Sequence, residues 1–212
     1  MKTLKILIAD DHAVVRRGVR QLLLESVRPE VVEEAESAAE ALRKAGERDW
    51  DIVILDVSLP GRTGLDVLAE IKRTKPGLPV LMLSMHPEDQ YAVRALRMGA
   101  AGYLTKDQAP EEIARAVRRI INGGRYVSPS LAEKLAFALG PAGDQAPHEA
   151  LSEREFEVFR LIASGRSVSE IGRDIHLSVK TVSTYRARVL EKMGLATNAD
   201  LTRYAIKAGL VD

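Results

Sequence analysis

Four short apolar segments in the first half of the chain each end at an acidic, hydroxyl or basic residue. The segments cover residues 4–9, 51–55, 79–83 and 101–105. Continuous apolar runs of this length, bounded by Gly, Pro and Asp, predict strands buried on both faces of a parallel sheet. The residues that follow the segments are Asp10 with Asp11, Asp56, Ser84 and Lys106. Because open α/β folds place their chemistry at the carboxyl edge of the sheet, we expect these side chains to gather in one site.

The chemistry of these endpoints predicts a site for a divalent cation and a phosphoryl group. Two to three carboxylates suit Mg²⁺, which prefers oxygen ligands and retains waters. A phosphoryl group on Asp56 would be strongly anionic, and Mg²⁺, the Lys106 ammonium and the Ser84 hydroxyl would neutralise or hydrogen-bond its oxygens. Taken singly, each residue is better explained as a helix cap or a loop residue, and Asp11 could cap the helix that follows it. Complementary groups at four strand ends favour the phosphoryl site.

Composition excludes several classes of function. The chain of 212 residues is 46 % hydrophobic and has no cysteine, which excludes disulfides, thiolate catalysis and Cys-ligated zinc and suits a reducing cytosol. Its four histidines are scattered and show no metal-ligand spacing. The first apolar stretch ends at Asp10, too early for a secretory signal, and no stretch approaches the length of a membrane span. We expect a soluble, cytoplasmic protein without a membrane partner.

Apolar segments alternate with amphipathic helical patterns from residue 1 to about 122. A more polar segment near 31–35 adds one strand to the four above and suits an edge of the sheet. The helical patterns lie near residues 13–26, 38–47, 64–74, 88–98 and 110–122. Five such units predict an α/β domain with a doubly wound, five-stranded parallel sheet.

The pattern changes after residue 124. A short helix is expected over 128–138, where Ser128 is the cap and Pro129 opens the first turn. Residues 139–148 contain Gly, Pro and Ala without apolar periodicity, which indicates a linker. The predicted division is a first domain at 1–124, a short helix and linker at 125–150, and a second domain at 151–212.

The second domain is predicted to be a small all-α domain of four helices. Ser152 and Glu155 stand at the spacing of a capping box, and Asn198 is expected to start the last helix. The expected helices run from Ser152 to Gly165, over about 168–175, from Ser178 to Gly194, and over about 199–208.

The strand ends and the segment after Asp56 resemble the receiver domain of bacterial response regulators. The resemblance covers residues 3–122 and includes the segment from Asp56 to Gly64, DVSLPGRTG, with the other endpoints in the order typical of that family. It implies a flavodoxin-like fold, Mg²⁺ as cofactor, and phosphorylation of Asp56 by a sensor histidine kinase. A receiver catalyses only its own phosphoryl transfer and dephosphorylation, so the resemblance implies a regulator and not an enzyme.

The same resemblance implies roles for individual residues. The implied Mg²⁺ site consists of Asp10, which holds a metal-bound water, Asp11, Asp56 and the backbone carbonyl of Ser58. The implied switch residues are Ser84, Tyr103 and Lys106. When Ser84 turns toward the phosphoryl group, the Tyr103 ring would turn inward and remodel the surface of the helices near 88–98 and 110–122.

The expected helix over 178–193 has a basic, polar face opposite an apolar one. Its basic residues are Lys180, Arg186, Arg188 and Lys192. Its apolar positions Val182, Val189 and Met193 fall on one stripe. A helix with a small, polar and basic front fits the major groove of DNA. Because the whole domain is only mildly basic, composition alone leaves a protein-interaction or dimerisation module open.

Motifs in the second domain resemble the LuxR-type helix-turn-helix, and with the receiver they resemble the NarL/FixJ architecture. They occupy residues 151–155, 162–167, 170–171 and 177–182. The resemblance implies that 178–193 is the recognition helix and that the last helix mediates dimer contact. The implied base-facing residues are Ser183, Thr184 and Ala187. The candidates for phosphate or groove-rim contacts are Lys180, Thr181, Arg188 and Lys192.

Together these resemblances imply a two-component response regulator whose phosphorylation on Asp56 gates binding to DNA as a dimer. The implied partners are a sensor histidine kinase, double-stranded promoter DNA and a second copy of the chain, with RNA polymerase as a further candidate. Three alternatives stay open. A phosphatase with an aspartate nucleophile usually needs an acid two residues after Asp56, where Ser58 stands. A phosphorylation-gated interaction switch would bind no specific DNA, and a regulator independent of Asp56 would bind DNA equally well as Asp56→Asn.

Overall fold

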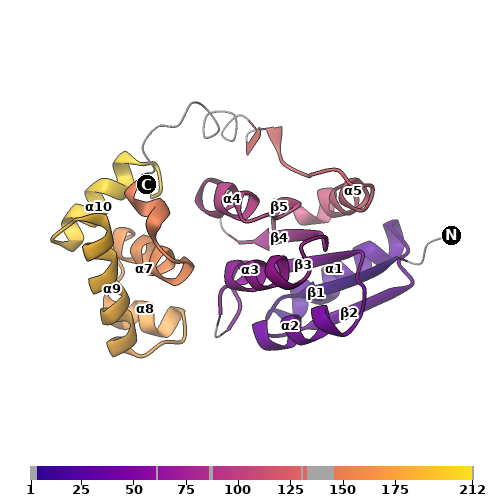
Figure 1. Ribbon diagram of the computed structural model, residues 1–212, viewed down its shortest axis with the longest axis horizontal. Coiled ribbons are helices and arrows are strands. Elements are labelled where there is room, and N and C mark those ends of the chain that lie inside the picture. Colours follow the sequence, from indigo (N-terminus) through magenta and orange to yellow (C-terminus); the bar gives the residue numbers. More distant parts are fainter. Residues whose placement is uncertain (1–3, 61, 86–87, 130, 133–145, 212) are drawn as a thin grey trace. The chain divides into compact units, whose positions relative to one another are not determined.

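The computed structural model describes residues 4–60, 62–85, 88–129, 131–132 and 146–211 (Figure 1). The chain divides into two units, Met1–Ala138 and Leu139–Asp212, and each is described by itself. The division falls within the segment 125–150, which was predicted to hold a short helix and a linker. The domain limits at residues 124 and 151 stay a prediction. Across the ranges described, no helix is both long enough and apolar enough to cross a membrane.

A parallel sheet forms the centre of the first unit. In its described residues the strands are β1 Lys5–Ala9, β2 Val31–Ala35, β3 Ile52–Asp56, β4 Val80–Ser84 and β5 Gly102–Thr105. Their order across the sheet is β2-β1-β3-β4-β5, and every neighbouring pair is parallel. The predicted five-stranded parallel sheet is confirmed. The polar strand β2 lies at an edge, as its composition predicted, because only one of its sides pairs with another strand.

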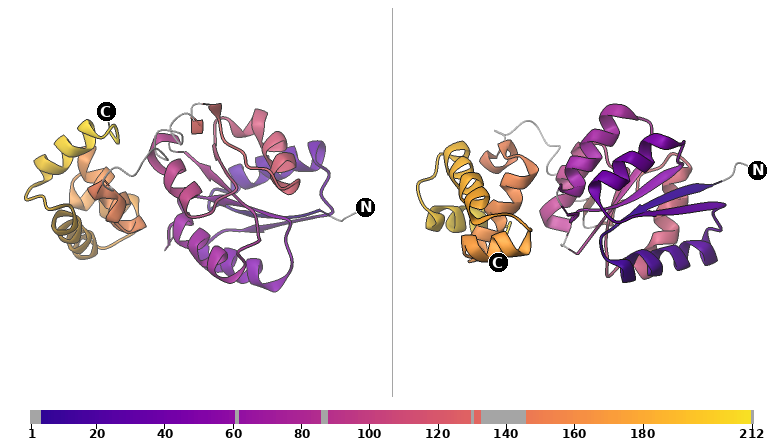
Figure 2. Two further views of the ribbon diagram at one scale, coloured as in Figure 1. Left: turned by 45° about the horizontal axis from the view of Figure 1, so that its top comes forward. Right: turned by 90° about the horizontal axis from the view of Figure 1, so that it is seen from below.

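Helices cover both faces of this sheet. They are α1 Ala13–Ser26, α2 Ala38–Glu47, α3 Gly64–Thr74, α4 Glu88–Arg97 and α5 Ala109–Ile121, each within one residue of its predicted bounds. Helix α1 packs beside α5 on one face, and α2 packs beside α3 on the other (Figure 2). Aliphatic side chains of β1 and β3 meet α1 and α5 in a buried core that includes Ile8, Leu23, Ile54 and Ile113.

The strand register brings the predicted endpoints to one level. Ala9 of β1 pairs with Leu55 of β3, so the residues that follow, Asp10 and Asp56, leave the sheet side by side. Asp56 in turn pairs with Leu83 of β4, one residue before Ser84. Ser84 then pairs with Thr105 of β5, one residue before Lys106. The carboxyl edge of the sheet therefore presents all of these groups together.

The chain after α5 returns to the sheet instead of leaving it directly. Tyr126 forms a parallel bridge with Gly102, and its backbone N–H donates to the Ala101 carbonyl at 2.9 Å. The backbone N–H of Tyr103 donates to the Tyr126 carbonyl at 3.3 Å. This bridge was not predicted from the sequence, because an isolated bridge has no periodicity. The predicted helix starts at Ser128, whose Oγ accepts the Leu131 N–H at 3.1 Å, while 133–138 and the linker residues 139–145 lie outside the described residues.

The described residues of the second unit are helical. A 3₁₀ turn, η1 Pro147–Ala150, precedes α7 Glu153–Ala163, α8 Val168–Asp174, α9 Val179–Met193 and α10 Asn198–Lys207. A capping box begins α7 at Ser152, as predicted, another begins α8 at Ser167, and Gly194 ends α9 with φ 64°. The last helix begins at Asn198, as predicted. Thr197 is its cap, because its side chain accepts the Asp200 N–H while the Asp200 carboxylate accepts the Thr197 N–H.

Candidate functional site

Acidic side chains and one ammonium meet at the carboxyl ends of β1, β3 and β5. Lys106 Nζ lies 2.7 Å from Asp10 Oδ2 and 2.8 Å from Asp56 Oδ2. Asp10 and Asp56 are each 1 % exposed. Asp10 and Asp56 end the neighbouring strands β1 and β3, and the Lys106 side chain reaches both of them from the end of β5, which β4 separates from β3. We call Asp10, Asp11, Asp56 and Lys106 the acid pocket.

Backbone groups fix the two buried carboxylates. Asp10 Oδ1 accepts the His12 N–H at 2.8 Å, and Asp56 Oδ1 accepts the Ser58 N–H at 3.2 Å. The backbone N–H of Lys106 donates to the Ser84 carbonyl at 2.7 Å, which ties the end of β5 to the end of β4. The loop at Ser58 thus contacts Asp56, while the predicted metal contact of its carbonyl stays a prediction.

Burial sets the protonation of the acid pocket. Burial, together with the nearby charge of Asp10, raises the pKa of Asp56 from 3.8 to about 6, although Lys106 acts in the opposite direction. Burial alone would lower the pKa of the Lys106 ammonium, but the carboxylates of Asp56 and Asp10 raise it above its usual value. Asp56 is therefore ionised at neutral pH. Its buried charge lowers the stability of the folded state.

Removing this charge should stabilise the Mg²⁺-free protein. The pKa of Asp56 is about 6 in the folded chain, above its usual value of 3.8, so the folded state binds more protons between these two pH values and loses stability as pH rises through them. Asp56→Asn should raise the free energy of unfolding by about 2–3 kcal/mol near pH 7.5 and by only about 1 kcal/mol near pH 4.5. Denaturant unfolding with a chelator present measures both values. An equal gain at the two pH values, or any gain in the exposed control Asp49→Asn, would contradict this cause.

The acid pocket fits a hard divalent cation. Ligand atoms of Asp10, Asp11, His12 and Asp56 lie within 4.8 Å of one another. The buried Asp10 Oδ2 accepts no hydrogen bond of good geometry from any described residue, although the Lys106 charge lies beside it. Such an oxygen is suited to a cation or to a metal-bound water. Carboxylate oxygens outnumber the single imidazole, which favours Mg²⁺ over softer metals.

His12 is a member of this cluster that was not predicted from the sequence. Its Nδ1 lies 2.6 Å from Asp11 Oδ1, and its side chain is 62 % exposed. The spacing of the histidines does not indicate His12 as a metal ligand, because its partner is an adjacent aspartate. Its position directly after Asp10 and Asp11 was the available signal.

The predicted switch residues Ser84 and Tyr103 lie in the interior. Both are completely buried, at the end of β4 and within β5 respectively. Tyr103 pairs with Met82 in the sheet register, two residues before Ser84. The Tyr103 ring therefore points inward in this structure. The movement of Ser84 or Tyr103 on phosphorylation stays a prediction.

Helix α9 separates its faces as predicted. Val182, Val189 and Met193 are buried. The side chains of the opposite face are exposed at Lys180, Ser183, Thr184, Ala187 and Arg188. Thr181 is half-buried, and its Oγ1 lies 2.8 Å from the hydroxyl of the capping residue Ser178. Six of the seven predicted DNA-contact residues thus lie on or beside the solvent-facing side of α9, and their contacts with DNA stay a prediction.

The seventh residue, Lys192, has a partner within the protein. Its Nζ lies 2.6 Å from Glu155 Oε2, and the Glu155 side chain is only 4 % exposed. The same oxygen accepts the Ser152 N–H at 2.8 Å. Burial alone would raise the pKa of the Glu155 carboxyl, but the hydrogen bonds from Lys192 and Ser152 lower it. Lys192 therefore joins the end of α9 to the start of α7.

Lys192→Met should destabilise the helical unit. The substitution leaves the buried Glu155 carboxylate without its cationic partner, which should lower the free energy of unfolding by about 1–2 kcal/mol. Lys180→Met, on the exposed face of the same helix, should change it by less than about 0.5 kcal/mol. Chemical denaturation of both variants measures the difference. Equal stabilities would leave Lys192 with no structural role and favour a simple phosphate contact.

Comparisons with known proteins cover both units. The family model described as "Response regulator receiver domain" matches residues 6–118. The family model described as "Bacterial regulatory proteins, luxR family" matches residues 149–205. The first match contains the acid pocket, and the second contains α7, α8 and α9.

Relatives are similar over almost their whole length. The response regulator GacA of Pseudomonas protegens is 37 % identical over 99 % of this chain and 98 % of its own. The response regulator UvrY of Escherichia coli is 35 % identical over 98 % of this chain and 95 % of its own. Among solved structures, RcsB from Salmonella enterica serovar Typhimurium, bound to promoter rprA in the presence of the phosphomimetic BeF3-, has a TM-score of 0.64 and 28 % identity. That similarity covers 96 % of this chain and 98 % of RcsB.

Proposed function

Because this chain belongs to the NarL/FixJ-type two-component response regulators, which regulate transcription by binding DNA and are not enzymes, we propose that it carries a phosphoryl group on Asp56 and that this group gates its binding to promoter DNA. One observation carries the proposal. The Lys106 ammonium lies within 2.8 Å of both Asp10 and Asp56 at the carboxyl edge of the sheet. A cation in this place stabilises the charge that develops on a phosphoryl group during transfer.

The acceptor atom is a carboxylate oxygen of Asp56. In the transfer, the bond between phosphorus and the histidine nitrogen of the kinase breaks, a bond between phosphorus and the Asp56 oxygen forms, and the nitrogen keeps the electron pair. The carboxylate must be ionised to attack, and its pKa of about 6 leaves it ionised at neutral pH. Lys106 then pairs with the new anionic oxygens, as its position beside Asp56 Oδ2 allows.

Mg²⁺ is the cofactor proposed for the acid pocket. Asp11, Asp56 and the carbonyl of Ser58 would hold it, with Asp10 holding one of its waters. When bound, it would supply positive charge that offsets the carboxylates and the phosphoryl oxygens. The fit rests on the clustered carboxylates and on the buried Asp10 Oδ2, which lacks a well-directed hydrogen-bond donor in the described part of the chain.

The proposed switch connects this site to the surface of α4 and α5. Ser84 would donate its hydroxyl to the phosphoryl group, and Tyr103 would hold its ring inward when it does. Because α4 and α5 both pack against β5, a change at Tyr103 reaches the surface that these helices form. Phosphorylation shifts the population of states only by the difference in these contact energies.

Helix α9 is the proposed recognition helix. Ser183, Thr184 and Ala187 would face bases, while Lys180, Thr181 and Arg188 would contact phosphates. Lys192 would do so only if it can contact DNA while bound to Glu155. The exposed polar face of α9 supports this assignment, as does the similarity to a structure described as an RcsB–DNA complex, at a TM-score of 0.60 and 27 % identity.

The remaining partners follow from the family. A sensor histidine kinase is the proposed phosphodonor, and a homodimer is the proposed DNA-binding form, with α10 in the dimer contact. One similar structure is described as two RcsB dimers bound to two parallel DNAs. RNA polymerase is a further proposed partner at the promoter. The receiver domain is proposed to span 1–124 and the DNA-binding domain 151–212, and the lack of cysteine suits work in a reducing cytosol.

Selection of genomic DNA fragments tests the proposal. The purified protein is incubated with fragments in Mg²⁺, with and without beryllofluoride as a phosphoryl mimic. We expect a shared two-part sequence to be retained only with the mimic. Equal retention in both conditions would overturn the gating and keep the DNA binding. No selective retention in either condition would favour a phosphorylation-gated protein-interaction switch.

A further inference from the structure

Arg16 is a buried cation on a helix face that is otherwise apolar. It lies on the buried side of α1 with Val19 and Leu23, and its side chain is 6 % exposed. The spacing of these three residues is the spacing at which an amphipathic helix carries apolar side chains. Burying a guanidinium costs free energy unless each donor finds a partner, so a well-packed apolar residue would serve the fold at least as well. The position of Arg16 therefore calls for a reason beyond packing.

The partners of Arg16 include the backbone of the acid pocket. Its Nη1 donates to the Asp10 carbonyl at 2.7 Å. On the other side of the residue, the Asp10 N–H donates to the Ala35 carbonyl at 3.1 Å. The carbonyl that Arg16 holds belongs to the peptide between Asp10 and Asp11. The orientation of this peptide therefore determines the directions in which the Asp10 and Asp11 side chains leave the backbone.

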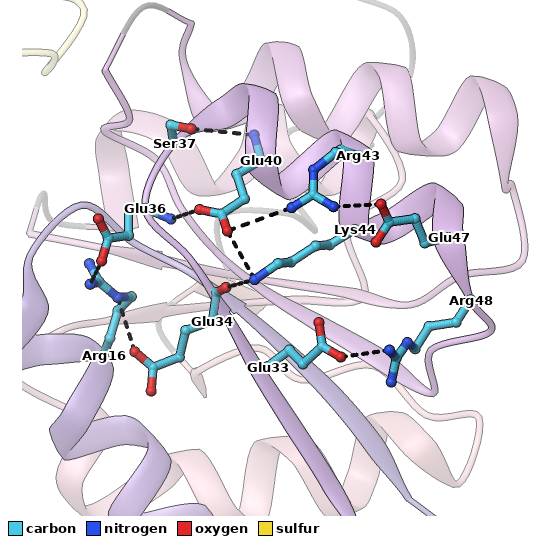
Figure 3. Close-up of polar contacts among 10 residues, drawn as sticks. All are labelled: Arg16, Glu33, Glu34, Glu36, Ser37, Glu40, Arg43, Lys44, Glu47 and Arg48. Atoms are coloured by element: carbon cyan, nitrogen blue, oxygen red, sulfur yellow. Dashed lines mark hydrogen bonds and ion pairs between the residues drawn. The ribbon is translucent and has the colours of Figure 1, made fainter.

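A closed chain of polar contacts holds the guanidinium itself in place (Figure 3). Arg16 Nε lies 3.2 Å from Glu34 Oε2, and Nη2 lies 2.6 Å from Glu36 Oε1. The Glu36 N–H donates to Glu40 Oε2 at 2.9 Å, and Lys44 Nζ lies 2.9 Å from Glu40 Oε1. Lys44 Nζ also donates to the Glu34 carbonyl, which completes the ring.

This ring joins three elements around the end of β2. Arg16 comes from α1, Glu34 from β2, and Glu40 and Lys44 from α2. The Glu36 backbone N–H and the Lys44 ammonium lower the pKa of the Glu40 carboxyl, so this member stays charged. Because Nε, Nη1 and Nη2 each donate to a different residue, Arg16 cannot rotate away from the Asp10 carbonyl without breaking the ring.

We propose that Arg16 is a positioning residue for the acid pocket: by fixing the peptide between Asp10 and Asp11, it sets the affinity of the pocket for a divalent cation. The inference rests on the proposed function, because it concerns the Mg²⁺ site named there. Groups that orient metal ligands without touching the metal typically change metal affinity by about 10–100-fold when they are removed.

Arg20 provides a matched control on the same helix. Its Nε lies 3.7 Å from Glu34 Oε1, so it pairs with the same carboxylate as Arg16. The contacts of Arg20 do not include the Asp10 carbonyl among the hydrogen bonds of the described residues. Arg16→Met and Arg20→Met each remove one cation beside Glu34, and only the first frees the pocket backbone. Glu34 and Glu36 are 32 % and 71 % exposed, so water can solvate them in either variant.

Calorimetric titration of the full chain with Mg²⁺ tests the proposal. We expect Arg16→Met to bind Mg²⁺ at least tenfold more weakly than wild type, and Arg20→Met to stay within twofold. We expect Arg16→Lys, with one donor group in place of the fork, to lie between them. Without Mg²⁺, hydrogen exchange at the Asp11 amide should speed up in Arg16→Met and stay unchanged in Arg20→Met. A general loss of stability would not confine faster exchange to this turn.

The outcomes separate this inference from the proposed function. Equal Mg²⁺ affinities for wild type and Arg16→Met would overturn the positioning role alone. A wild-type chain without saturable Mg²⁺ binding would overturn the proposed metal site itself. If Arg16→Met does not fold, Glu36→Gln decides, because it keeps Arg16 and weakens one contact that orients it. A weaker Mg²⁺ affinity in Glu36→Gln supports the proposal, and an unchanged affinity overturns it.

Discussion

Asp56→Asn is expected to abolish acceptance of a phosphoryl group. The amide that replaces the carboxylate has no anionic oxygen to form the new bond to phosphorus, and no other carboxylate in the acid pocket occupies its place at the end of β3. The neighbouring Asp10 follows β1 and already accepts the His12 N–H through Oδ1. Incubation with Mg²⁺ and a small phosphodonor such as acetyl phosphate, followed by intact mass, measures the modification.

Two variants make this result specific. Asp49→Asn removes a fully exposed carboxylate between α2 and β3. This variant should accept the phosphoryl group at the wild-type rate. Lys106→Met keeps Asp56 but removes the ammonium 2.8 Å from its Oδ2, so it should slow the reaction without moving its location. A stable phosphoryl group on Asp56→Asn would show that another residue is the acceptor. DNA retention by Asp56→Asn that equals mimic-bound wild type would show a regulator that works without Asp56.

Gly64→Ala should be the most damaging conservative substitution in the receiver unit. A Cβ on Gly64 would lie 1.9 Å from the Asp56 carbonyl oxygen and 2.8 Å from its carbonyl carbon. Both are backbone atoms of β3, and the Gly64 N–H also donates to the Val57 carbonyl at 2.7 Å. The first turn of α3 would therefore have to move away from the strand that carries Asp56. We expect the free energy of unfolding to fall by about 3 kcal/mol or more.

Gly18→Ala is the matched control for this prediction. Gly18 lies in α1, and a Cβ there meets nothing within 4 Å. In a helix such a change should stabilise by about 0.5–1 kcal/mol, because alanine loses less backbone freedom on folding. Urea denaturation of the three proteins gives both values. A Gly64→Ala chain as stable as wild type would mean that α3 can shift without cost, and a phosphorylation rate equal to wild type would mean that Asp56 does not depend on this contact.

Local sequence pattern predicted the elements of both units almost residue by residue. Continuous apolar runs predicted strands, 3.6-residue periodicity predicted helices, and residues such as Ser152 and Gly194 marked helix starts and ends. These signals depend on neighbours within one turn or one strand, so they can be read without the fold. The cap of the last helix fits this limit: the helix begins at Asn198, as predicted, but its cap Thr197 was not predicted, because Thr197 and Asn198 are both good caps and the Asp200 side chain decides between them.

The membership of the acid pocket was also readable from the sequence, because parallel strands bring their carboxyl ends to one edge. The polar residues Asp10, Asp56, Ser84 and Lys106 at the strand ends therefore predicted a common site. The distances of Lys106 from Asp10 and Asp56 agree with it. The resemblance to receivers added roles to those residues. Periodicity by itself left the order of the strands open, and that order places Asp10 next to Asp56.

Only the tertiary structure decided which partners the long charged side chains have. Lys192 pairs with Glu155 across 37 residues, and Arg16 reaches the Asp10 backbone, Glu34 and Glu36 from the buried side of α1. The sequence determined that α9 has a basic face and that α1 is amphipathic, yet it assigned Lys192 to the DNA and gave Arg16 no role. A flexible cation can reach many partners. Which one it meets depends on how separate elements pack together, and that packing leaves no local period in the chain.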